Sequence, residues 1–209
     1  TGIERSVGVI IGERPVVPGA GFPEDGETAI ELERVSAMAA RFGGKPSGLV
    51  PVGARPANRV IAALHSVDFR ARGLADYGKP GNYFERQIGR WSKQYQASVT
   101  QPITEMDRLI DWLPAHIPAS ARDEGLTSIV HADYRLDNVI FHPSEPRILA
   151  VLDWELSTLG HPLADFSYHC MAWHIPPGTF RGIGGLDLAA LGIPSEPDYI
   201  RRYCERTGF

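Results

Sequence analysis

HADYRLDNVIFHPSEPRILAVLDWE, residues 131–155, is the densest run of polar, chemistry-bearing side chains in the sequence. Three apolar segments frame it, at 128–131, 139–142 and 148–154, and each is typical of a short strand. The turn residues at 143–146 separate the last two segments. This spacing predicts that those two segments pair as an antiparallel hairpin.

Three oxygen-bearing side chains fall at the ends of the expected strands. Asp133 follows the first strand, Asn138 precedes the second, and Asp153 ends the third. Each one alone could be an ordinary turn residue, but their order and spacing favour a shared site. Two carboxylates and an amide oxygen form the hard-oxygen site that Mg²⁺ prefers. Phosphoryl transfer needs this set, because one carboxylate positions the attacking hydroxyl while others hold the metal.

The order His131-x-Asp133-x4-Asn138, followed by Asp153-Trp-Glu, resembles the aminoglycoside phosphotransferase family of kinase-like enzymes. By this resemblance, Asp133 is the catalytic base and His131 braces the catalytic loop. Asn138 and Asp153 would hold Mg²⁺. Asp165, in the following helix, would steady the loop.

The wider sequence, from about residue 57 to 209, resembles the branch of that family that is associated with acyl-CoA dehydrogenases. The resemblance implies ATP or GTP as co-substrate and a small-molecule hydroxyl as acceptor, such as a hydroxyacyl-CoA or a related acid. It also implies a functional link to an acyl-CoA dehydrogenase. One departure is Ala132, where the family usually has glycine. An alanine is tolerated there unless the backbone requires a positive φ.

The expected fold class is α+β and kinase-like, with a helical C-terminal lobe at 58–209 that carries the hairpin. Residues 1–57 form an atypical N-terminal segment rich in glycine and proline. A kinase-like N-terminal lobe supplies a lysine for the nucleotide phosphates, yet the first lysine here is Lys45. It follows a capped helix expected at 28–42, whose Glu31 or Glu33 would be the glutamate that pairs with such a lysine. We therefore expect a truncated copy, and the alternative function is an inactive kinase-like fragment or a nucleotide-binding module.

Apolar periodicity predicts the helices. Residues 84–95 and 103–113 carry apolar stripes at helical spacing, and we expect both stripes to face the core. Further helices are expected to end near His65, to start at Pro162, and to span 197–206. Residues 45–56 read as a loop, and a short strand is expected at 7–11.

Composition excludes several classes. The formal net charge is −4, which does not favour a nucleic-acid partner. No apolar run approaches the roughly 20 residues of a membrane span, and two cysteines without framework spacing favour the reducing cytoplasm.

A zinc hydrolase built on the histidines is an alternative, although only two of them are close in sequence. The histidines concerned are His142, His161, His169 and His174.

Overall fold

The structure is a computed structural model of the 209-residue chain. It describes residues 10–11, 14–15, 50–122, 124–142, 145–178 and 182–209. The helix expected at 28–42, its two glutamates and Lys45 lie outside these ranges. Of the strand expected at 7–11, only β1 (Ile10–Ile11) is described, and it pairs antiparallel with β2 (Arg14–Pro15).

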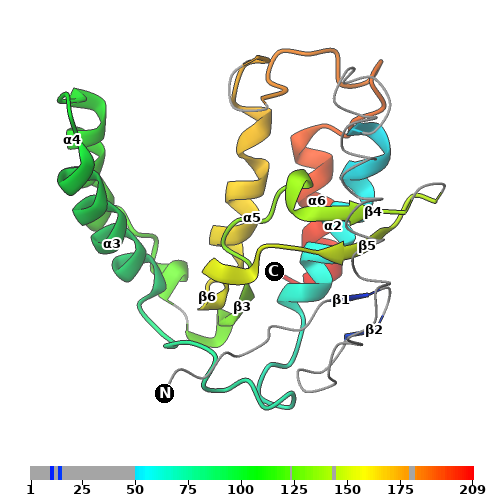
Figure 1. Cartoon of the computed structure of the whole chain (residues 1–209), viewed down its shortest axis with the longest axis horizontal. Helices are drawn as coiled ribbons and strands as arrows, with labels where there is room; N and C mark the ends of the chain where they lie inside the picture. Colours follow the sequence, from blue (N-terminus) through cyan, green and yellow to red (C-terminus); the bar gives the residue numbers. More distant parts are fainter. Residues whose placement is uncertain (1–9, 12–13, 16–49, 123, 143–144, 179–181) are drawn as a thin grey trace, which may run out of the picture.

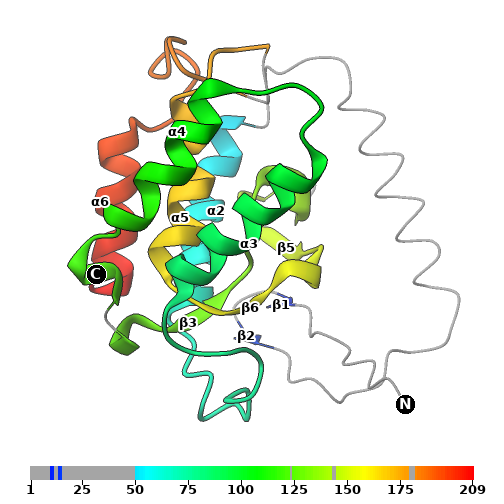
Figure 2. The same cartoon turned by 90° about the vertical axis from the view of Figure 1, so that its left-hand side faces the viewer.

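Three helices form the body of the described chain: α2 (Val50–His65), α5 (Pro162–Cys170) and α6 (Glu196–Thr207). They lie side by side in both views (Figures 1 and 2). Between them, the ring of Phe166 stacks on that of Tyr203, with centroids 3.7 Å apart. The ring of Tyr199 lies parallel to Phe166 at 5.8 Å. This aromatic stack joins α5 to α6 and forms the centre of the main core.

The start of α2 corrects an expectation, because residues 50–56 are helical and not a loop. Pro56 lies inside the helix and cannot donate a backbone hydrogen bond there. Buried side chains at Ala54, Ala57, Asn58 and Ile61 follow the i, i+3, i+4, i+7 pattern of a core-facing helix. The free energy gained by burying this face outweighs the tendency of Pro56 to interrupt a helix.

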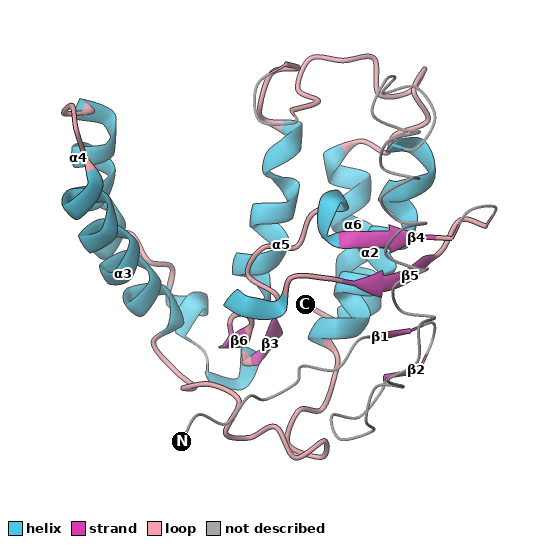
Figure 3. Ribbon diagram, in the orientation of Figure 1, coloured by secondary structure: helices cyan, strands magenta, loops and turns pink. Residues whose placement is uncertain are grey.

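Two antiparallel strand pairs lie beside the helices (Figure 3). The expected hairpin is confirmed as β4 (Val139–Phe141) and β5 (Ile148–Val151). The sequence did not predict the second pair, in which β3 (Ser128–Val130) joins β6 (Thr158–Gly160). Short 3₁₀ turns complete the description: η1 (Leu113–Ala115), η2 (Ala119–Arg122), η3 (Glu124–Leu126), η4 (Leu136–Asn138), η5 (Trp154–Leu156) and η6 (Met171–Trp173).

The helices α3 (Tyr83–Ser98) and α4 (Thr104–Trp112) form an arm on one side of the body (Figure 1). Both helices were expected, but the prediction that their apolar stripes face the core is wrong. Trp91 is 46% exposed, and no residue of α4 is buried. Periodicity reports that a helix has an apolar face; it does not report which partner covers it.

Two expectations from composition concern the cysteines and the possibility of a membrane-spanning helix. Cys170 on α5 and Cys204 on α6 are free thiols, and Cys170 is buried among apolar side chains. Among the described residues, no helix has the length and apolarity that crossing a bilayer requires.

The stack at Phe166 generates a stability prediction. We expect Phe166→Ala to lower the free energy of unfolding by about 3–5 kcal/mol, because the side chain is 5% exposed and leaves a cavity. Leu163→Ala, on the same helix but 39% exposed, should cost less than about 1 kcal/mol. Urea denaturation of both variants measures the two values. Equal losses would contradict the location of the core.

Candidate active site

Asp133 and Asn138 meet in the loop between β3 and β4. The Asn138 side-chain amide donates to the Asp133 carboxylate oxygen Oδ2 and to the Asp133 backbone oxygen, both at 2.9 Å. Because the amide nitrogen faces Asp133, the amide oxygen of Asn138 is turned the other way. The loop therefore brings the Asp133 and Asn138 side chains into contact through the amide nitrogen, with the amide oxygen on the far side.

Two further side chains contact the Asp133 carboxylate. The guanidinium Nη2 of Arg135 lies 3.1 Å from Oδ2, and the hydroxyl of Tyr168 on α5 donates to Oδ1 at 3.0 Å. The side chain of Asp133 is 17% exposed, so the carboxylate stays accessible from one side. Each carboxylate oxygen can accept two hydrogen bonds, which leaves Oδ1 able to accept another.

The sequence reading missed both contacts. Arg135 lies within the motif, and its positive charge two residues after Asp133 was an available signal. Tyr168 is 35 residues from Asp133 in the chain, and no local pattern marks it as a partner.

His131 connects the loop at 131–138, the proposed catalytic loop, to the end of β5. Its Nε2 lies 2.7 Å from the Leu152 backbone oxygen, and Asp133 N–H donates to its Nδ1 at 3.3 Å. A carbonyl can only accept, so Nε2 carries the proton and Nδ1 is the acceptor. The Leu152 N–H donates to the Asn138 backbone oxygen at 2.8 Å. Leu152 is therefore fixed from both sides, and Asp153 follows it directly.

Asp153 adopts the left-handed backbone region, with φ 65° and ψ 56°. It is exposed, and its side chain makes no capping bond to the turn η5 that follows. Aspartate is one of the few residues that enters this region at modest cost. The bend follows Leu152, whose N–H donates to the Asn138 backbone oxygen, so Asp153 and Asn138 lie on adjoining backbone segments. An aspartate oxygen and an amide oxygen suit Mg²⁺, which takes oxygen ligands and keeps several waters.

Asp165 ties this loop to the helical body. Its Oδ2 accepts from the His131 backbone N–H at 2.6 Å, and its Oδ1 accepts from the Ala132 backbone N–H at 3.0 Å. Oδ2 also lies 3.2 Å from Nε2 of His65 on α2, and both side chains are fully buried. The Asp165 position agrees with the loop-steadying role implied by the family resemblance, while its His65 partner was missed.

His65 in turn contacts α6. Its Nδ1 lies 2.7 Å from the hydroxyl of Tyr203. Burial, and then the charge of Asp165, raise the pKa of Tyr203, so its hydroxyl stays protonated at neutral pH. The chain Tyr203–His65–Asp165 thus connects α6 and α2 to the backbone of the catalytic loop.

Ala132 meets the condition under which a glycine would be preferred. Its φ is +66°, in the left-handed region where a Cβ atom is crowded. The hydrogen bond from its N–H to Asp165 holds it there. The catalytic loop therefore carries local backbone strain at the residue before Asp133.

The four candidate histidines lie in different environments. His142 and His174 pair with Glu145 and Glu196, and His161 caps α5. Among the described residues, no group of three or more His, Cys, Asp or Glu side chains is placed to hold a metal ion. The zinc hydrolase alternative has no support in this part of the chain.

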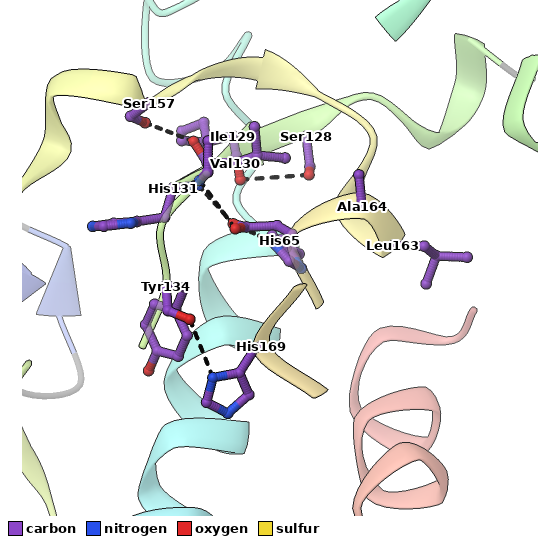
Figure 4. Close-up of polar contacts among 12 residues, drawn as sticks. His65, Ser128, Ile129, Val130, His131, Tyr134, Ser157, Leu163, Ala164 and His169 are labelled. Atoms are coloured by element: carbon purple, nitrogen blue, oxygen red, sulfur yellow. Dashed lines mark hydrogen bonds and ion pairs between the residues drawn. The ribbon is translucent and has the colours of Figure 1, made fainter. Parts of the chain in front are cut away.

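His169 has a structural role instead. Its Nδ1 donates to the Tyr134 backbone oxygen at 3.2 Å, and its Nε2 accepts from the Tyr199 hydroxyl at 2.7 Å. Figure 4 shows the His169 ring reaching Tyr134, and Ser157 reaching Val130. Burial lowers the pKa of His169 from 6.5 to about 4, so the ring is neutral in the folded chain at pH 7.

A cleft opens beside the catalytic loop, between α3 and α5. Its volume is about 180 Å³, smaller than the roughly 300–1,000 Å³ that is usual for small-molecule sites. Ala132 and Tyr168 form its wall on the loop side. On the α3 side, its wall includes Phe84, Arg90 and Trp91. An acceptor in this cleft would lie against Tyr168, whose hydroxyl contacts the Asp133 carboxylate.

Comparison with known proteins gives concordant matches. The model of the phosphotransferase enzyme family matches residues 30–199. Acyl-CoA dehydrogenase family member 10 of Mus musculus is 48% identical over 153 residues, 72% of this chain and 14% of that protein. Acyl-CoA dehydrogenase family member 11 of Rattus norvegicus is 45% identical over 150 residues, 71% of this chain and 19% of that protein.

A solved structure from Ralstonia eutropha, assigned as an aminoglycoside phosphotransferase, is also similar. It is 64% identical with a TM-score of 0.73, over 79% of this chain and 50% of that chain. This chain thus spans half of that structure and less than a fifth of the two curated relatives.

The strain at Ala132 can be measured. We expect Ala132→Gly to raise the free energy of unfolding by about 1 kcal/mol, because glycine adopts a positive φ without crowding. The same change at the exposed helical residue Ala63 should lower it by about 1 kcal/mol. Thermal and urea unfolding measure both. A destabilised Ala132→Gly variant would argue against the left-handed geometry.

His169 generates a pH prediction. Its folded-state pKa of about 4 lies below the ordinary value of 6.5, so the unfolded chain takes up the proton first as pH falls. Its contribution is present above pH 6.5 and is lost between pH 6.5 and 4, by up to about 3 kcal/mol. His169→Gln does not titrate and should lose less stability over that interval. Parallel losses in urea titrations of the two proteins would show that His169 is not held neutral.

Proposed function

This chain belongs to the phosphotransferase enzyme family, and on that premise we propose that it transfers the γ-phosphoryl group of ATP or GTP to a small-molecule hydroxyl. The observation that carries the proposal is the Asp133 carboxylate, which is fixed by Asn138, Arg135 and Tyr168 yet remains accessible. Positioning and electrostatic stabilisation supply nearly all of the catalysis in phosphoryl transfer. A rigidly held carboxylate at the edge of an open cleft meets that requirement.

Asp133 would act as the base. The acceptor hydroxyl gives its proton to the Asp133 carboxylate while its oxygen forms a bond to the γ-phosphorus. The bond from that phosphorus to the oxygen it shares with the β-phosphate breaks, and the nucleoside diphosphate leaves with the electron pair. Arg135 and Asn138 both bind Oδ2, so Oδ1, beside Tyr168, is the oxygen that can receive the proton.

Asn138 and Asp153 would hold Mg²⁺ through the amide oxygen and the carboxylate. A Mg²⁺ ion held by these residues would supply positive charge against the negative charge that develops on the transferred phosphoryl group. The contribution of the protein is to keep these two residues in register. It does so through Leu152, whose backbone groups bond to Asn138 on one side and to His131 on the other.

The acceptor is proposed from the relatives. Two of them are named as acyl-CoA dehydrogenases, enzymes that act on acyl thioesters of coenzyme A. A kinase-like domain joined to such an enzyme would act on a related compound that carries a hydroxyl. We propose a hydroxyacyl-CoA or the corresponding hydroxy acid as acceptor, and an acyl-CoA dehydrogenase as functional partner.

Substitution of the two aspartates tests the proposal. In transfer assays with Mg·ATP and hydroxyacyl-CoA thioesters, Asp133→Asn and Asp153→Asn should each lower kcat by about 100-fold or more. Asp137→Asn, an exposed aspartate in the same loop, is the matched control and should retain near wild-type activity. Removal of Mg²⁺ with EDTA should abolish transfer. Radiolabelled phosphoryl transfer to the acceptor measures each rate.

The same assays distinguish an active phosphotransferase from the alternative function, a nucleotide-binding module. If wild-type protein gains thermal stability with Mg·ATP but transfers no phosphoryl group, the chain is a nucleotide-binding module. Full activity in Asp133→Asn would remove the proposed base.

A further inference from the structure

The cleft beside Asp133 continues along α3 into a second hollow. Both are lined by Gln87, Arg90 and Leu156, so the two spaces adjoin. The second hollow lies further from the catalytic loop, between α3 and the segment 155–158 that leads into β6. One elongated ligand could therefore reach from Tyr168 to the far end of the second hollow.

The two ends of this continuous space differ in chemistry. Next to Asp133, the first hollow is lined by the aromatic rings of Phe84, Trp91 and Tyr168. The second hollow is lined by three cations and one carboxylate, and these residues are Lys79, Arg86, Arg90 and Glu155. The whole chain has a formal net charge of −4, so this local excess of positive charge departs from its average. Such a surface favours an anionic ligand group.

Arg86 supplies a second, independent observation. Its Nη2 donates to the Lys79 backbone oxygen at 2.6 Å, which fixes the guanidinium at the wall of the hollow. Its Nη1 is buried and has no hydrogen-bond partner among the residues that the structure describes. A buried donor without an acceptor costs free energy, and native sites rarely leave one unmatched. Since Arg86 lines the hollow, its guanidinium group is placed to interact with an anionic ligand group there.

We propose that Lys79, Arg86 and Arg90 form a subsite for a phosphate group carried by the acceptor. The proposal rests on the function above, because it assumes that the acceptor hydroxyl lies at Asp133. Three cations around one hollow match the multiple charge of a phosphate or diphosphate better than the single charge of a carboxylate. The apolar part of the acceptor lies against Phe84 and Trp91, and its phosphate group lies at the basic end.

Direct binding tests the subsite without catalysis. The probes are coenzyme A and pantetheine, which shares its thiol arm but lacks phosphate groups, with Mg·ADP present to occupy the nucleotide site. Coenzyme A should bind at least tenfold more tightly than pantetheine by isothermal titration calorimetry. Its affinity should fall with added salt, because charges near the surface are screened. Equal binding of the two probes would overturn the proposal.

Variants of α3 test whether its positive charge causes the tighter binding of coenzyme A. Arg90→Gln should weaken coenzyme A binding roughly three- to tenfold, and the reversal Arg90→Glu should weaken it further. Lys93→Gln on the same helix does not line either hollow and is the matched control for loss of one positive charge. Pantetheine binding should not change in any of these variants. Unchanged coenzyme A binding in Arg90→Glu would refute the subsite.

Kinetics separates this inference from the proposed function. Lys79→Gln, at a residue that lines only the second hollow, should raise KM for a phosphate-bearing acceptor while kcat and the KM for ATP stay within about twofold of wild type. KM for the free hydroxy acid should not change. This result would show that the recognised group is a phosphate of the coenzyme A thioester and not a free carboxylate. If Asp133→Asn keeps full activity while Arg90→Glu loses coenzyme A binding, the proposed base fails and the subsite stands.

Discussion

The buried carboxylate of Asp165 is the constraint on which the candidate site depends. It accepts two consecutive backbone N–H groups, from His131 and Ala132, and its Oδ2 also contacts His65. A buried carboxylate is costly unless it is paired and hydrogen-bonded, and here three donors from two segments satisfy it. Folding of the helical body therefore sets the start of the catalytic loop, because Asp165 and His65 belong to α5 and α2.

This anchoring explains how the loop maintains unfavourable backbone geometry. Ala132 and Asp153 both have φ near +65°, and each lies next to a residue fixed by hydrogen bonds. Strain of this kind persists only where the surroundings over-determine it, and it concentrates at functional sites. At Ala132 the bend turns the chain from β3 into the loop, so that Asp133 does not continue the strand. At Asp153 it ends β5 and presents a carboxylate. The two bends place the proposed base and a proposed metal ligand outside regular structure.

Sequence reasoning recovered the parts of this arrangement that are local in the chain. The hairpin follows from alternation and turn residues over 13 residues, and Asp133 and Asn138 lie five residues apart with their contact inside one loop. Contacts between distant segments were not accessible in this way. Tyr168 reaches Asp133 from a helix, and β3 pairs with β6 across 30 residues. Neither contact leaves a periodic pattern, so only the assembled fold shows it.

The same distinction explains the errors at the helices. In α2, a proline at position 56 dominates the local reading, yet the buried face of the helix decides the outcome. In α3, the apolar stripe predicts a core-facing helix, whereas Phe84 and Trp91 line a cleft. Exposed aromatic rings beside a fixed carboxylate have a use that core residues lack, since they can hold the apolar part of a ligand. The basic hollow beyond them would repel a polycation such as an aminoglycoside and attract an anion. On the proposed function, the loop at 131–138 would perform the chemistry, and the charge that α3 contributes to the hollow would select the acceptor.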